Sequence, residues 1–321
     1  MRPSEDADQQ PAHGQSFAGI RGGSTLPRVG CVIVTYRPDH EPLLRQVAAI
    51  RPQVDDIVLV DNGDGSGLPA FSDGFGLEIV CLGGNEGIAK AQNVGIRRVR
   101  ERGATHLLLL DQDSLPAADM VACLAEGLTQ LRYAGTAVAA VGPQYCDHRQ
   151  GTLSPFVYRE GLTLKERPTR EPQSATVPTD FLIASGCLIP AEILDTVGNM
   201  DETLFIDYVD IEWGLRAQYL GYASYGIPAA KMAHSLGDDW VVYRGRRFPV
   251  HSPLRHYYFV RNSLLLVRRP WIGWPWRWIL VLRMAKQFVF FSVVVPGKRL
   301  VNAWMMAKGI WHGVIGRRGK L

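Results

Sequence analysis

The sequence lacks several features that would place it in a specialised class of protein. It has five cysteines in 321 residues, and no pair of them has the spacing of zinc ligands. Three of them, Cys31, Cys81 and Cys187, lie within apolar runs, which indicates reduced, buried thiols in a cytosolic protein. The net charge of +4 is too small to indicate a nucleic-acid partner, and the N-terminus has no apolar secretion signal. The hydrophobic content of 46% is enough for a sizeable core.

The chain divides by composition into three parts. Residues 1–28 are polar and aperiodic, as in a disordered leader. Residues 29–240 alternate β-rich and helical patterns, which predicts an α/β catalytic domain. Residues 241–321 are rich in Trp and Arg and predict a helical extension. Basic pairs concentrate in this last part, which favours an anionic partner, either phosphates or lipid headgroups.

The middle part predicts a mostly parallel sheet flanked by helices. Short apolar runs that end in polar residues alternate with amphipathic segments, the pattern of right-handed strand–helix–strand units. We expect residues 148–179, which are polar and contain proline, to form an irregular lid or mobile loop. The expected strands are 29–36, 56–60, 77–81, 106–110, 136–141 and 181–189, and the expected helices are 42–50, 88–102 and 116–131.

The run His106–Ser114 is the most informative stretch. Four leucines predict a strand buried on both faces, and this strand delivers Asp111 and Asp113 to its carboxyl end, where open α/β sheets bind ligands. Two carboxylates one residue apart suit Mg²⁺ or Mn²⁺, which complete their coordination with water and substrate phosphates. The alternative is that Asp111 caps a turn and Asp113 caps the next helix, with no metal.

A second acidic stretch precedes a helix. Asp207, Asp210 and Glu212 fall within six residues, and opposite a metal–phosphate site they are interpreted as a general base with its supporting groups. The alternative is an acidic helix start. Asp207 and Asp210 could share one helical face, so spacing alone leaves both as the base. His234 is either structural or a further metal ligand.

The C-terminal part contains four tryptophans close to several arginines. The apolar run Trp278–Val295 is interrupted by Arg283, Lys286 and Gln287, which a spanning helix tolerates poorly. We therefore expect a helix that lies in the membrane interface with its basic residues at the headgroups. The alternative is an ordinary packing helix.

Taken together, these segments resemble the family-2 inverting glycosyltransferases of the glycosyltransferase-A fold, and within them the bacterial rhamnosyltransferases. The resemblance covers about residues 29–262. It rests on Val32–Tyr36, Val60–Asn62, Asn85–Gly95, Leu110–Ser114, Ser185–Gly186, Phe205–Trp213, His234–Asp238 and Arg255–Asn262.

The resemblance implies roles for individual residues. Asp210 would be the general base, with Asp207, Glu212, Trp213, Ser185 and Gly186 supporting catalysis or the acceptor. The nucleotide-sugar would be bound by Thr35, Tyr36, Asp61, Asn85, Lys90, Asn93, Asp111, Gln112, Arg255 and Arg261, and the metal by Asp111, Asp113 and His234.

The implied activity is the transfer of L-rhamnose from dTDP-L-rhamnose to a lipid-linked or polysaccharide acceptor in cell-surface glycan synthesis. The enzyme would lie on the cytoplasmic face of the membrane, attached to its anionic surface, and no nucleic acid would be bound. A UDP-sugar donor remains an alternative. A nucleotidyltransferase is disfavoured because a plain helix, without a Gly-rich basic loop, follows Thr35–Pro38. A non-catalytic carbohydrate-binding protein would not need Asp111, Asp113 and Asp210 together.

Overall fold

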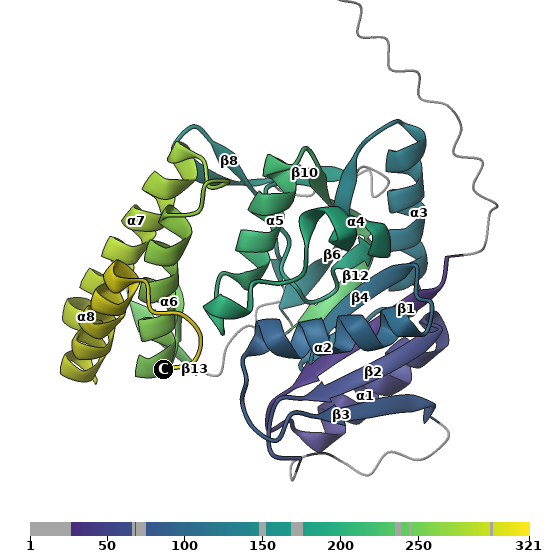
Figure 1. Cartoon of the computed structure of the whole chain (residues 1–321), viewed down its shortest axis with the longest axis horizontal. Coiled ribbons are helices and arrows are strands. Elements are labelled where there is room, and N and C mark those ends of the chain that lie inside the picture. Colours follow the sequence, from purple (N-terminus) through teal and green to yellow (C-terminus); the bar gives the residue numbers. More distant parts are fainter. Residues whose placement is uncertain are drawn as a thin grey trace, which may run out of the picture.

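A computed structural model describes residues 27–65, 68, 75–147, 152–167, 176–234, 239–243, 246–295 and 298–321. One large sheet, ten-stranded in the described part, has helices on both faces, and three further helices pack at one side (Figure 1). The strands of this sheet are β1 (Val29–Thr35), β2 (Asp56–Asp61), β3 (Leu77–Cys81), β4 (His106–Asp111), β5 (Ser114–Pro116), β6 (Val138–Asp147), β7 (Thr152–Leu153), β10 (Val177–Thr179), β11 (Leu188–Pro190) and β12 (Ala223–His234).

The helices follow the strands as crossovers and then form the C-terminal group. They are α1 (His40–Ile50), α2 (Ile88–Glu101), α3 (Met120–Tyr133), α4 (Ala191–Val197), α5 (Val209–Tyr219), α6 (Pro253–Val267), α7 (Trp274–Val289) and α8 (Arg299–Ile315). Short helical turns are η1 (Arg51–Gln53), η3 (Glu202–Leu204) and η4 (Phe290–Val294), the last of them a π-helix. Two hairpins lie outside the large sheet, β8 (Phe156–Glu160) with β9 (Thr163–Arg167), and β13 (Asp239–Tyr243) with β14 (Arg246–Val250).

The sheet is mostly parallel around its centre, as predicted. Its order is β10-β12-β6-β11-β4-β1-β2-β3, and β4, β1, β2 and β3 are all parallel. The register pairs Val34 with Asp111 and Thr35 with Asp61. The polar residues that end these strands therefore share one edge of the sheet, where α/β sheets bind ligands.

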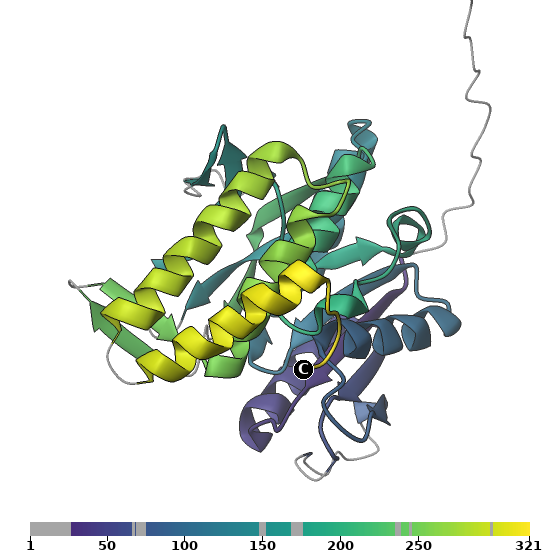
Figure 2. The same cartoon turned by 60° about the vertical axis from the view of Figure 1, so that its left-hand side comes forward.

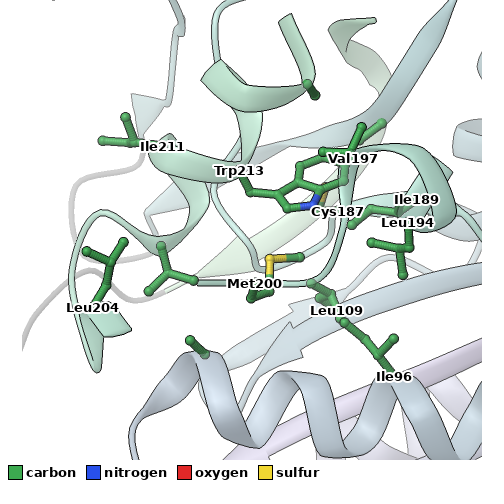
Figure 3. Packing of buried hydrophobic residues seen from close by; sticks show 14 of the residues in the cluster. Ile96, Leu109, Cys187, Ile189, Leu194, Val197, Met200, Leu204, Ile211 and Trp213 are labelled. Carbon is green, nitrogen blue, oxygen red and sulfur yellow. The ribbon is translucent and has the colours of Figure 1, made fainter. Parts of the chain in front are cut away.

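Alternation along β1 explains how both faces of the sheet are covered. Val32 and Val34 point into the core beneath α2, α4 and α5, whereas Cys31 and Ile33 point into the core beneath α1 and α3. Figure 3 shows part of the first core, where Ile96 of α2, Leu109 of β4, Leu194 of α4 and Trp213 of α5 gather. Strands buried on both faces are continuously apolar, which is why these runs were recognisable in the sequence.

Two expected segments differ from the structure. Within residues 148–179 the described part is not irregular: it contains the β8–β9 hairpin, whose Phe156 packs over Gly226 so closely that a Cβ there would lie 2.2 Å from the ring. The predicted strand 181–189 is ordered as a strand only at Leu188–Pro190. Ser185 and Gly186 turn the chain instead, because Gly186 has a φ of 82°.

The C-terminal helices are packed into the domain. Ile272, Trp276, Ile279 and Leu280 belong to the same hydrophobic core as α2 and α5. Figure 2 brings α7 and α8 to the front, and both helices pack against α6. None of the helices in the described ranges has both the length and the apolar character needed to cross a bilayer.

Candidate active site

A cavity of about 390 Å³ lies at the carboxyl end of β4. Five charged residues from four separate segments line it: Asp111, Asp207, Asp210, Arg255 and Arg283. The structure therefore brings together the two acidic stretches that the sequence places about 100 residues apart, and it adds cations from α6 and α7.

Ser185 and Gly186 support the end of β4. The Asp111 backbone N–H donates to Ser185 Oγ at 3.1 Å, and Ser185 Oγ lies 2.5 Å from Ser114 Oγ. Gly186 N–H donates to the carbonyl of Leu109 at 2.7 Å, and a Cβ on this glycine would meet Pro143 Cγ at 2.4 Å. These contacts fix the direction in which Asp111 leaves the sheet.

The predicted metal ligands lie close together along the backbone. Asp111 is half-buried in the cavity wall, and Asp113 is exposed. β5 pairs with the end of β12 so that His234 is opposite Ser114, one residue from Asp113; the His234 side chain and residues 235–238 lie outside the described part. The described residues contain no cluster of three His, Cys, Asp or Glu side chains that could hold a metal. Two hard oxygen donors without a complete protein shell fit a cation such as Mg²⁺, which takes its other ligands from water and phosphate.

The ends of β1 and β2 form a connected polar group. Thr35 Oγ1 donates to Asp61 Oδ1 at 3.2 Å, and Gly65 N–H donates to Asp61 Oδ2 at 2.8 Å. Tyr36 and Gln112 exchange two hydrogen bonds, with Tyr36 N–H donating to Gln112 Oε1 at 2.7 Å. These contacts link the exit of β1 to the Asp111–Asp113 turn.

Helix α2 presents a different face to the cavity from the one that the resemblance implied. Asn85 Oδ1 accepts from Asn62 and from Gly87 N–H, before the helix begins. Lys90 pairs with Glu86 at 2.7 Å, and Asn93 bonds Met200 and Glu202; both Lys90 and Asn93 line another hollow.

Gln92 lines the active-site cavity in their place, together with Ile88. It is 2% exposed, and its Oε1 has no hydrogen-bond partner in the described part of the chain. Sequence reasoning missed Gln92, although its i+4 spacing from Ile88 puts the two on one helical face.

The two carboxylates at the start of α5 are held by an unusual backbone. Phe205, Asp207 and Tyr208 have φ values of 66°, 63° and 67°, a left-handed conformation that non-glycine residues rarely adopt. Such strain clusters at functional sites. Asn262 Nδ2 donates to the carbonyls of Leu204, Ile206 and Asp207, which holds this loop in place.

Asp207 and Asp210 have different partners. Arg255 Nε donates to Asp207 Oδ1 at 3.1 Å, whereas Asp207 Oδ2 is buried with no partner among the described residues. Asp210 Oδ1 accepts the N–H of Ile211 at 2.8 Å. Burial raises the pKa of both carboxyl groups, opposed at Asp207 by Arg255 and at Asp210 by backbone N–H groups. The charge of Asp207 raises the pKa of Asp210 further.

Glu212, Trp213 and Arg261, which the resemblance also assigned to the site, do not line the cavity and have structural contacts instead. Glu212 is fully buried and bonded to both Arg216 and Trp271, and Trp213 Nε1 donates to the carbonyl of Gly198 at 2.9 Å. Arg261 is also fully buried, and its guanidinium donates to the carbonyls of Leu204 and Gly319. In the structure these side chains secure α5, α6 and the strained loop.

Arg283 of α7 is the second cavity residue that sequence reasoning did not place there. It lies 5.7 Å from the ring centroids of both Tyr208 and Phe259, and its charge lowers the pKa of Asp207. Arg283 and Lys286 were expected at lipid headgroups. In the structure Arg283 lines both this cavity and an adjoining one, which Lys286 and Gln287 also line, and Lys286 is exposed. Their i, i+3, i+4 spacing, which places them on one face of the helix, was the available signal.

The structure thus places carboxylates at the carboxyl ends of a mostly parallel sheet and a second acidic pair in the same cavity, an arrangement that suits a metal–phosphate group beside a general base. The chain belongs to glycosyl transferase family 2, whose model matches residues 31–198. It is 37% identical over 240 residues to the dTDP-rhamnosyl transferase RfbF of Shigella flexneri, an alignment that covers 74% of this chain and 79% of that protein.

Solved structures share the fold. GalNAc-T7, crystallised with UDP, GalNAc and Mn²⁺, matches with a TM-score of 0.56 at 14% identity over 91% of this chain, which spans 57% of that one. Residues 1–349 of S. aureus TarS match with a TM-score of 0.53 at 12% identity, over 89% of this chain and 81% of that one. The fold is thus glycosyltransferase-A, and the chain is a glycosyltransferase.

Proposed function

We propose that this glycosyltransferase moves L-rhamnose from dTDP-L-rhamnose to a hydroxyl of a lipid-linked acceptor in cell-surface glycan synthesis. The single observation that supports a transfer reaction best is that Asp111 and Asp210, which lie about 100 residues apart in the sequence, line the same cavity. The similarity to a dTDP-rhamnosyl transferase over most of the chain supports the choice of donor.

The donor is proposed to lie across the carboxyl ends of β1, β2 and β4. Thr35, Tyr36 and Asp61 would border the nucleoside, and Asp111 and Asp113 would hold Mg²⁺ or Mn²⁺ at the diphosphate, with His234 as a further candidate ligand. When bound, such a cation supplies positive charge to the leaving diphosphate. GalNAc-T7, which shares the fold, was crystallised with Mn²⁺.

Asp210 is proposed as the general base. The acceptor O–H gives its proton to the Asp210 carboxylate while its oxygen bonds to the sugar C1, and the bond from C1 to the diphosphate oxygen breaks. A single displacement inverts C1 and needs one base and no carboxylate nucleophile. The strained backbone before α5, held by Asn262, would orient this carboxylate.

Arg255 and Arg283 are proposed to balance negative charge in the cavity. Arg255 is engaged with Asp207, which is the competing candidate for the base. This ion pair is the reason to favour Asp210, since a carboxylate held by arginine is a weaker proton acceptor.

The apolar outer surface of α7 and α8 is proposed to attach the enzyme peripherally to the cytoplasmic face of the membrane. Exposed side chains there are Trp274, Trp278, Leu300, Trp304, Trp311 and Ile315. Tryptophan and aliphatic residues of this kind bind at the membrane interface.

The donor assignment is tested by thermal stabilisation with dTDP-L-rhamnose, UDP-glucose and UDP-GlcNAc, each with Mg²⁺, Mn²⁺ or EDTA. We expect stabilisation by dTDP-L-rhamnose with metal, lost in EDTA and in Asp113→Ala. Asp119→Ala, which removes an aspartate from the other side of β5, is the matched control and should behave like the unsubstituted protein. Stabilisation by a UDP-sugar alone would show that the donor is not dTDP-L-rhamnose.

A further inference from the structure

A second, larger cavity adjoins the active site. It has a volume of about 960 Å³ and lies between α6, α7 and η4. Most of its wall is apolar, and we call it the apolar groove. The apolar residues that line it are Phe259, Ala285, Val289, Phe290, Phe291 and Val294.

The apolar groove is continuous with the catalytic cavity. Asp207, Arg255, Phe259 and Arg283 line both. A ligand that extends from the catalytic cavity into the groove therefore passes beside both Arg255 and Arg283.

Positive charge is concentrated at the junction of the two cavities and just beside it, because Arg283 lines both cavities and Lys286 lines the groove alone. Arg283 and Lys286 form no ion pair in the part of the chain that the structure describes, and they lie one helical turn apart on α7. Arg255 adds a third cation, partly offset by Asp207. A phosphate or diphosphate suits this position, because arginine and lysine bind phosphate oxygens through charge-assisted hydrogen bonds.

Two further features of the groove wall indicate a binding site. Gln287 Nε2 lies 2.8 Å from His256 Nδ1, and His256 Nε2 is buried without a partner among described residues. Burial lowers the pKa of His256 to about 4, so the ring is neutral at pH 7 and can donate from Nε2. The groove is also bordered by the π-helical turn η4, and π-turns are frequent at functional sites.

We propose that the apolar groove binds the hydrocarbon chain of the acceptor lipid, with the phosphate that joins chain to sugar held by Arg283 and Lys286. This inference rests on the proposed function. The order of sites matches the order of groups in such an acceptor: hydroxyl near Asp210, phosphate at the cationic junction, and chain in the groove. The groove's volume is typical of sites that enclose a small amphipathic ligand.

Farnesyl diphosphate, farnesol and inorganic pyrophosphate serve as probes, with binding followed by tryptophan fluorescence. We expect farnesyl diphosphate to bind at least about tenfold more tightly than either fragment, because only it fills both the groove and the junction. Equal affinity for farnesyl diphosphate and pyrophosphate would overturn the proposal.

The groove is tested by a matched pair of substitutions on α7 and η4. Val289 lines the groove and is 56% exposed, whereas Val293 is 64% exposed and does not line it. Val289→Glu places a charge in the groove and should weaken farnesyl diphosphate binding at least about tenfold, while Val293→Glu should change it less than about twofold. Equal effects of the two substitutions would refute the groove as the chain site.

The remaining outcomes separate this inference from others. Dihexanoylphosphatidylglycerol that competes as well as farnesyl diphosphate would overturn the proposal in favour of a membrane-phospholipid site. Failure of dTDP-L-rhamnose to bind, with farnesyl diphosphate still bound in the groove, would contradict the proposed donor alone. Donor use without farnesyl diphosphate binding would contradict the groove alone.

Discussion

Two carboxylates three residues apart, Asp207 and Asp210, line one cavity, and among the described residues only Asp207 is paired with an arginine. Spacing in the sequence could not separate them, because both fall at the start of the same helix. What makes the two carboxylates different is a contact from α6: Arg255, 48 residues further along the chain, donates a hydrogen bond to Asp207 and not to Asp210. Such a long-range contact has no local signal.

Asp210→Asn tests the general base. We expect transfer to fall by roughly 10²–10⁴, the usual contribution of a positioned base, with donor binding unchanged because the residues at β4 are untouched. The measurement is single-turnover transfer beside donor affinity. Asp207→Asn and Glu212→Gln are run in parallel, and a collapse in Asp207→Asn with near-normal transfer in Asp210→Asn would assign the base to Asp207.

The same substitution should change stability in a pH-dependent way. Burial raises the folded-state pKa of Asp210 above its ordinary value of 3.8, so its contribution to stability is full below that value and is lost as pH rises through the folded pKa. Asparagine cannot ionise, so Asp210→Asn removes the loss of stability that occurs when the buried carboxyl group becomes charged. At pH 7 we expect the variant to be more stable by about 0.5–2 kcal/mol, typical of relieving a strained active site.

Denaturant unfolding at a series of pH values measures the difference, which should disappear near pH 3.8. Asp39→Asn, an exposed residue just before α1 whose side chain makes no capping hydrogen bond, is the control, expected to stay within about 0.5 kcal/mol of the unsubstituted protein throughout. A pH-independent gain in Asp210→Asn would contradict burial of the charged carboxylate as its cause.

At the scale of elements, the start of α2 is attached to the loop that precedes α5. Ile88 N–H donates to the carbonyl of Phe205 at 2.8 Å, and a Cβ on Gly87 would lie 2.6 Å from that oxygen. Gly87 also has a φ of 92°. A glycine is therefore required at position 87 for two reasons: its positive φ, and the close approach of the loop that precedes α5.

Gly87→Ala should lower the free energy of unfolding by about 1–3 kcal/mol, the usual cost of a strained backbone position. Gly84→Ala is a matched control three residues earlier, because a Cβ there would meet nothing within 4 Å. Urea unfolding of the two variants measures the contrast. Equal decreases in the free energy of unfolding for the two variants would mean that the close contact of Gly87 with Phe205 does not contribute to stability.

The sequence predicted the elements that are buried on both faces and failed where structure depends on distant partners. The runs that became β1, β2 and β4, which are buried on both faces, were recognised together with their polar ends, and so was the partly exposed edge strand β3. Of the acidic residues singled out in the sequence, Asp111, Asp207 and Asp210 line one cavity, whereas Glu212 is buried elsewhere. The helix at 116–131 begins only at Met120, because Ser114–Pro116 pairs with β12 instead. Gln92 and Arg283 were missed because each turns inward on a helix whose partners lie elsewhere in the chain.

For the whole molecule, the exposed aromatic surface of α7 and α8 is the feature to test for membrane binding. Removing residues 271–321 would also remove Trp276, Ile279 and Leu280 from the core, so a truncated chain would not isolate the effect. Surface substitutions on α8 avoid this, because Trp304 and Trp311 are 70% and 62% exposed.

Trp304→Ser with Trp311→Ser should reduce sedimentation with anionic liposomes by at least about tenfold, since each tryptophan can bury a large apolar area in the interface. Tyr133→Ser with Tyr219→Ser removes two exposed aromatic side chains from α3 and α5 and should have no such effect. Liposome binding that survives the tryptophan pair would contradict attachment through α8.

The positions of the cavity residues along the chain have a consequence for how such enzymes diversify. The family model ends at residue 198, after β1, β2 and β4, whereas Asp207, Asp210, Arg255 and Arg283 all come later. A genetic crossover near that point would exchange the proposed base Asp210 and the apolar groove as one contiguous segment and keep the Asp111–Asp113 edge. The contacts of Asn93 with Met200 and of Ile88 with Phe205 cross this boundary, so only hybrids that preserve them should fold.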